Sequence, residues 1–69
     1  MISISFNKKV YRKDCVLRAI DDYAYIANIS FSEHDGYYIC NFSNTKYDLE
    51  VTKKEFTNYL IELQNSRSI

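Results

Sequence analysis

The Asp35-Gly36 pair constrains the fold of this chain more than any other feature of its sequence. Gly36 is the only glycine among 69 residues, and the sequence contains no proline. An Asp-Gly pair between two runs of alternating apolar residues is the strongest short-range signal for a two-residue β-hairpin, because a type I′ turn requires positive φ at both central residues. The pair therefore predicts two antiparallel strands, over residues 27–33 and 37–42. It also fixes their register: Glu33 faces Tyr38, Phe31 faces Cys40 and Ile29 faces Phe42.

This register divides the hairpin side chains between an inner and an outer face, since successive residues of a strand point to opposite sides. The apolar side chains gather on the inner face: Ala27, Ile29, Phe31, Cys40 and Phe42. The outer face is mainly small and polar: Asn28, Ser30, Ser32, His34, Tyr37, Ile39 and Asn41.

Tyr37 and Ile39 stand out on this otherwise polar outer face, and His34 lies directly across from Tyr37. An apolar cluster on a polar sheet face is typical of a contact patch. The same residues also fit a purely structural role, because cross-strand aromatic and β-branched pairs stabilise hairpins by themselves. We take His34, Tyr37 and Ile39 as the candidate contact residues.

Three further segments show clear periodicity. Residues 2–6 alternate as a half-buried strand, with Ile2, Ile4 and Phe6 on one face and two serines on the other. The segment from Lys13 to Ala24 predicts a helix whose start, at Arg12, lacks a capping side chain. Its expected apolar stripe is Val16, Leu17, Ile20, Tyr23 and Ala24.

A second helix is expected near the end of the chain. Thr52 and Glu55 have the spacing of a capping box, with Val51 and Phe56 in the staple positions. The stripe that follows is Phe56, Tyr59, Leu60 and Leu63. Before it, Tyr47, Leu49 and Val51 alternate with acidic residues, which predicts a short fourth strand.

The order of elements is β-α-β-β-(β)-α. It predicts a single α+β domain over residues 1–69: a two-layer sandwich in which a three- to four-stranded sheet carries two helices on one face.

Composition excludes several classes of function. Nine basic and nine acidic residues cancel, whereas domains that bind nucleic acid through its phosphates usually carry a basic excess. No run is long enough for a transmembrane helix and no signal peptide is visible, so we expect a cytoplasmic protein. Cys15 and Cys40 could form one disulfide, but two reduced, buried thiols fit better where no export signal is present.

The residues offer little catalytic chemistry. His34 would need Glu33 or Asp35 to orient it as a base, and the register places Glu33 on the opposite face. No two metal ligands have the short spacing of zinc sites, and no glycine-rich loop can hold a phosphate. We therefore expect no catalytic residues, no metal and no cofactor.

Several segments resemble HxsD, the small component of the His-Xaa-Ser systems. They are Phe6 to Tyr11, the helix through Ala19 and Tyr23, the Asp35-Gly36-Tyr37 hairpin, and the run from Glu55 to Leu60. The resemblance implies a small accessory protein encoded with radical SAM maturases that modify a His-Xaa-Ser repeat peptide. It supplies no catalytic residues.

Two hypotheses of function follow. The first is a non-enzymatic accessory protein, an adaptor that binds a peptide or a maturation enzyme such as a radical SAM maturase. The alternative is a small single-stranded nucleic-acid-binding domain in which Tyr37 serves as a stacking platform, although a nucleic-acid partner fits the zero net charge poorly. A chain of this length buries a small core, so a homodimer is a further expectation.

Overall fold

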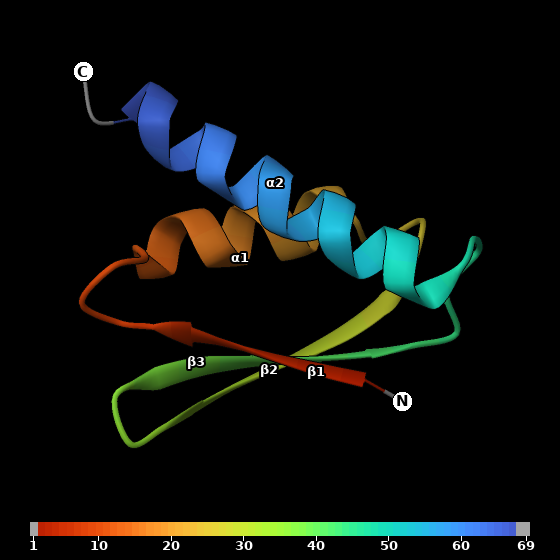
Figure 1. Ribbon diagram of the computed structural model, residues 1–69, viewed down its shortest axis with the longest axis horizontal. Helices are drawn as coiled ribbons and strands as arrows, with labels where there is room; N and C mark the ends of the chain where they lie inside the picture. Colours follow the sequence, from red (N-terminus) through yellow and green to blue (C-terminus); the bar gives the residue numbers. More distant parts are fainter. Residues whose placement is uncertain (1, 68–69) are drawn as a thin grey trace.

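A three-stranded antiparallel sheet lies beneath two helices in the computed structural model, which describes residues 2–67 (Figure 1). Both helices cover the same face of the sheet, and the other face is open. The expected α+β, two-layer architecture is confirmed, with three strands. The elements are β1 (Ile2–Asn7), α1 (Lys13–Asp22), β2 (Asn28–His34), β3 (Tyr37–Ser43) and α2 (Leu49–Arg67).

The hairpin has the geometry that the Asp-Gly pair predicts. Asp35 and Gly36 adopt φ values of 47° and 82°. The predicted register is confirmed: Glu33 pairs with Tyr38, Phe31 with Cys40 and Ile29 with Phe42. On β3, Tyr38, Cys40 and Phe42 are buried, while Tyr37 is exposed. Turn chemistry alone therefore assigned the two faces correctly.

The strand order is β1-β3-β2, so the last strand in the sequence lies in the middle of the sheet. Both neighbours are antiparallel to β3. Consequently β1 and β2 run in the same direction and form the two edges. The backbone N–H of Lys8 donates to the carbonyl of Gly36 at 3.0 Å, which extends the β1–β3 ladder to the hairpin turn.

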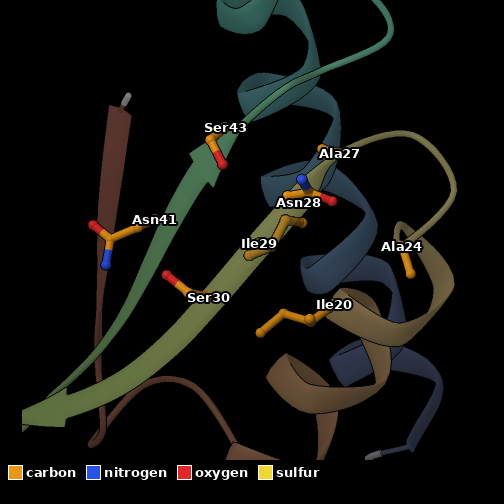
Figure 2. A pocket seen from close by; sticks show the side chains of 8 residues that line it. All are labelled: Ile20, Ala24, Ala27, Asn28, Ile29, Ser30, Asn41 and Ser43. Atoms are coloured by element: carbon orange, nitrogen blue, oxygen red, sulfur yellow. The ribbon is translucent and has the colours of Figure 1, made fainter.

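Helix α1 differs from expectation in its end and in its inward face. It ends at Asp22 rather than Ala24, and Tyr23 leaves the helical conformation with φ −97° and ψ 2°. The buried residues are Cys15, Val16 and Ala19. Leu17 and Ala24, which we expected in the core, are exposed. Figure 2 shows that Ile20 points toward Ile29 of β2 and that Ala24 lies near the end of the helix.

Helix α1 turns this face inward because it packs against α2 as well as against the sheet. Cys15 and Ala19 of α1 are fully buried, and their short side chains suit a close helix crossing. Asp22 accepts a hydrogen bond from the Tyr59 hydroxyl of α2, which fixes the same side of α1 against its neighbour. The periodicity of α1 fits either of two adjacent stripes, and this packing selects one of them.

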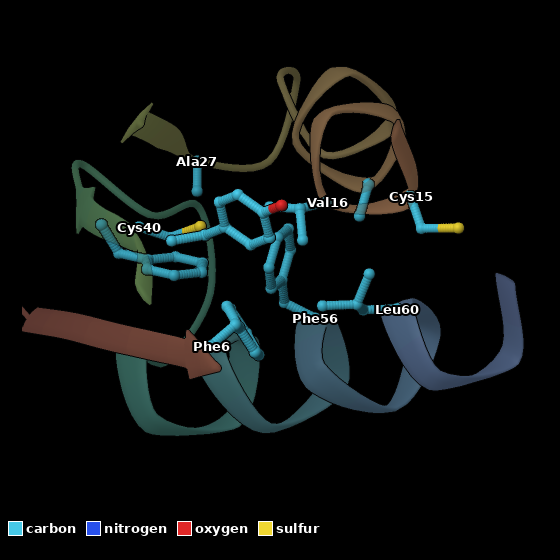
Figure 3. Close-up of a cluster of buried hydrophobic side chains, with 10 residues drawn as sticks. Phe6, Cys15, Val16, Ala27, Cys40, Phe56 and Leu60 are labelled. Atoms are coloured by element: carbon cyan, nitrogen blue, oxygen red, sulfur yellow. The ribbon is translucent and has the colours of Figure 1, made fainter. Parts of the chain in front are cut away.

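The core lies between the sheet and the helices and is built around Phe56. Figure 3 shows side chains from both layers converging on this region. The Phe56 ring meets Phe42 and Tyr23 edge to face, at centroid distances of 5.1 and 5.3 Å. The buried hydrophobic residues are Phe6, Cys15, Val16, Ala19, Ala27, Tyr38, Cys40, Phe42, Phe56 and Leu60.

Helix α2 starts one turn earlier than predicted, and this corrects two expectations. Residues 47–51 form no fourth strand, because Leu49–Val51 already belong to the helix. Asp48 caps it: Oδ1 of Asp48 accepts a hydrogen bond from the Val51 N–H at 3.0 Å. The expected capping residue, Thr52, lies inside the first turn, is buried, and donates its hydroxyl to the Asp48 carbonyl at 2.8 Å. Asp48 competes well for the cap position, because Asp is among the best N-cap residues.

Candidate functional site: the open face of the sheet

The three candidate contact residues lie together on the open face, in the half of the sheet near the hairpin turn. His34 of β2 and Tyr37 of β3 are direct cross-strand partners. On the other side of Tyr37 lies Asn7 of β1. Ile39 occupies the next outward position of β3, between Ser5 and Ser32. Tyr37 and Ile39 therefore occupy the middle strand of the face.

Small polar residues surround this pair. No lysine, arginine, aspartate or glutamate has its side chain on the open face of the three strands. The outward residues are Ser3, Ser5, Asn7, Asn28, Ser30, Ser32, His34, Tyr37, Ile39, Asn41 and Ser43. Two of them bond across the strands, where the Ser3 hydroxyl donates to Oδ1 of Asn41. Short polar side chains leave the ring of Tyr37 accessible, with 42% of its surface exposed.

This surface suits contact with another macromolecule. The Tyr37 ring offers apolar area together with a hydroxyl that can bond at a wet boundary. Serine and asparagine side chains bond to either a donor or an acceptor. Desolvating them costs less than desolvating charges. The face can therefore be covered without burying an unpaired charge.

His34 lies at the exposed hairpin turn, beside Asp35. Nε2 of His34 lies 3.1 Å from Oδ2 of Asp35, but both side chains are more than 70% exposed. Glu33 projects to the opposite face, as the register predicts. There it pairs with Lys13 at 2.7 Å and Lys8 at 2.8 Å. Hydrogen bonds from these two ammonium groups lower the pKa of Glu33 to about 2.

Both cysteines are buried, reduced thiols, as expected. Burial raises the pKa of the Cys40 thiol to about 11, so at neutral pH this side chain stays protonated and packs as an apolar group. Among residues 2–67, no three His, Cys, Asp or Glu side chains are grouped so as to hold a metal ion. Within the same range, neither helix has the length and apolar character needed to cross a lipid bilayer.

Sequence reasoning missed one feature of the surface, a groove at the edge of β2. The groove has a volume of about 320 Å³ and runs from Ile20 of α1 past the first residues of β2 to Asn41 and Ser43 on the open face of β3. It was missed because Ile20 and Ala24, which line it on the side of the helix, were expected in the core. The only signal in the sequence was that the apolar residues of α1 fit two adjacent stripes, so that one of the two could remain exposed.

Fold and site together define a small α+β domain with one open, uncharged sheet face. Comparison with known proteins adds no closer assignment, since no family model, no curated protein and no solved structure matches this chain.

Proposed function

We propose that this protein is a non-enzymatic interaction module that binds a protein or peptide partner on the open face of its sheet. The observation that carries the proposal is the composition of that face, where one aromatic and one aliphatic side chain lie on the middle strand and uncharged residues surround them. A central apolar anchor with a polar rim is the usual anatomy of a recognition surface. Tyr37 and Ile39 form the anchor, and His34 adds a polar contact beside it.

The resemblance to HxsD suggests which partner to test first. On this proposal the module is a cytoplasmic adaptor in the maturation of a ribosomally made peptide by radical SAM enzymes. The uncharged face is compatible with a peptide rich in serine and histidine, because such a peptide offers hydroxyl and imidazole groups rather than a dense charge.

The experiment measures binding of the purified chain to the radical SAM maturases and to the His-Xaa-Ser repeat peptide of the same genome, by calorimetry. We expect the double variant Tyr37→Ala, Ile39→Ser to weaken binding at least tenfold. Tyr25→Ala is the matched control, because this tyrosine is 77% exposed and lies outside the sheet. Equal affinity for the double variant and the wild-type chain would remove the open face from consideration.

Binding to single-stranded nucleic acid finds less support. Tyr37 could stack on a base, but the open face holds no lysine or arginine to track the phosphates. A fluorescence titration with single-stranded DNA distinguishes the two functions, because a stacking binder loses affinity steeply as salt rises.

A further inference from the structure

The edge of β2 carries backbone groups that no other part of the described chain uses. In the hairpin turn the carbonyl of His34 faces the N–H of Tyr37, so this pair is hydrogen-bonded and the bonded pairs alternate from there. Ile29 and Phe31 therefore belong to the non-bonded pairs, and their N–H and C=O groups point away from β3. The hydrogen bond from the Lys8 N–H to the Gly36 carbonyl fits the same alternation. It indicates that the even-numbered residues of β3 turn their N–H and C=O groups toward β1, whereas the odd-numbered ones turn theirs toward β2.

An apolar strip of α1 lies beside this open edge. Leu17 and Ile20 lie along the side of α1 turned away from α2, and Ala24 continues this strip just beyond the last helical residue, Asp22. Leu17 is 41% exposed, Ala24 is exposed and Ile20 is half-buried. With Ile29 of β2, Ile20 and Ala24 line the groove at the strand edge (Figure 2). None of the groove residues is charged.

We propose that this flank, the open edge of β2 together with the Leu17–Ile20–Ala24 strip, binds a second copy of the chain. The two β2 strands pair antiparallel about a two-fold axis, which joins the two sheets into one of six strands. The helices of both copies then lie on the same side of the joined sheet, and the two apolar strips meet above the new strand pair.

The charges along α1 favour a second copy over an unrelated strand. Lys13, Leu17 and Asp21 are spaced four residues apart, so they follow one side of the helix. Two antiparallel α1 helices that meet at Leu17 place Lys13 of each copy, which also pairs with Glu33 of its own chain, opposite Asp21 of the other. The surface is therefore complementary to itself, as an isologous interface requires.

The area of the flank sets the expected strength. A strand of seven residues is about 23 Å long, and two layers of about 10 Å each give a depth of about 20 Å. A face of this size buries on the order of 450 Å² per copy, or about 900 Å² in total, which is the range of weak, transient interfaces. We expect a reversible dimer whose population rises with concentration between about 10 μM and 1 mM.

Sedimentation velocity across this concentration range tests the proposal, with one backbone atom changed at a time. The cysteines allow synthesis by ligation of segments 1–14, 15–39 and 40–69. N-methylation of Ile29 removes one outward N–H of the β2 edge, and we expect it to weaken dimerisation at least tenfold. N-methylation of Ser5 is the matched control, because its N–H points outward from the opposite edge, on β1.

A second pair of variants tests the helix strip without touching the strand. Leu17→Lys introduces a charge at the centre of the strip and should abolish the dimer, while Asp21→Lys places lysines opposite one another and should weaken it. Both positions are exposed, so circular dichroism should show an unchanged fold. The proposal is overturned if the wild-type chain stays monomeric at 1 mM. It is also overturned if the two N-methylations have equal effects, or if the chain stays monomeric and binds an added extended peptide at β2 instead. None of these variants changes Tyr37 or Ile39. A negative result for the dimer therefore leaves the proposed function standing, and a negative result for partner binding on the open face leaves the dimer standing.

Discussion

Glu33 connects three segments of the chain through charge. Lys8 follows β1, Lys13 begins α1, and the Glu33 carboxylate on β2 pairs with both. The lowered pKa of Glu33 means that the folded state favours the ionised form. The resulting stabilisation is fully present above the pKa of the unfolded carboxyl and is lost as the pH falls toward about 2.

We therefore expect Glu33→Gln to flatten the pH dependence of stability in acid. Urea unfolding between pH 2 and pH 7 should show a wild-type free energy of unfolding that falls as the pH drops below about 4.5, and a smaller fall for the variant. Asp21→Asn is a suitable control, because Asp21 is also an exposed carboxylate. Parallel curves for Glu33→Gln and wild type would contradict the assignment.

Gly36 matters for its backbone rather than for the space around it. A Cβ atom at this position would meet no heavy atom within 4 Å, but φ is +82°. Gly36→Ala should therefore lower the free energy of unfolding by about 1–2 kcal/mol, all of it from the left-handed conformation. Gly36→Asn should cost less, because asparagine tolerates this region. Chemical denaturation measures both, and equal losses would point to a different cause.

At the scale of the element, the start of α2 distinguishes two capping schemes that the sequence allows. The structure assigns the cap to Asp48, whose carboxylate accepts the Val51 N–H. Asp48→Ala should then cost about 0.5–2 kcal/mol, whereas Glu55→Ala, which would break the capping box expected at Thr52, should change little. Thermal unfolding followed by circular dichroism compares the two. A larger loss of stability for Glu55→Ala than for Asp48→Ala would indicate that the helix begins at Thr52 instead.

The elements also show what periodicity predicts and where it fails. The hairpin was predicted residue by residue, because a two-residue turn leaves one register. The inward stripe of α1 was predicted in part: Val16, Ile20 and Tyr23 pack in or against the core, but Leu17 and Ala24 are exposed. A helix with apolar residues over half its circumference has no single preferred inward face until another helix packs against it. The fourth strand failed for a related reason: three alternating apolar residues also fit the first turn of a helix, and Asp48 decided between the two.

At the scale of the whole molecule, two aspects of the arrangement were beyond sequence reasoning. The order of elements gave the fold class, but no residue indicated that β3 would lie between β1 and β2. The neighbour of Tyr37 on its β1 side, Asn7, was therefore not foreseen. The candidate contact residues themselves were brought together as expected, since both strands that carry them belong to the hairpin.

One buried ring should decide whether the molecule folds at all. A domain of this length has a free energy of unfolding of roughly 3–10 kcal/mol. Phe56→Ala removes a fully buried side chain that contacts the rings of Phe42 in the sheet and of Tyr23 just after α1, at a cost of about 3–5 kcal/mol. We expect this variant to lose its cooperative thermal transition. Ile61→Ala, on the exposed side of the same helix, should keep it.

The position of β3 in the middle of the sheet has a consequence for how the chain is made. Of the three described strands β1 is synthesised first, but β3, its strand partner in the sheet, begins at Tyr37. Until then its row of backbone donors and acceptors has no partner strand among the described residues. The hairpin closes through local contacts and so should form first, with β1 joining as the last strand. In a cell, β1 is therefore the strand of this sheet that waits longest for its partner, and it is the strand most in need of protection from other nascent chains.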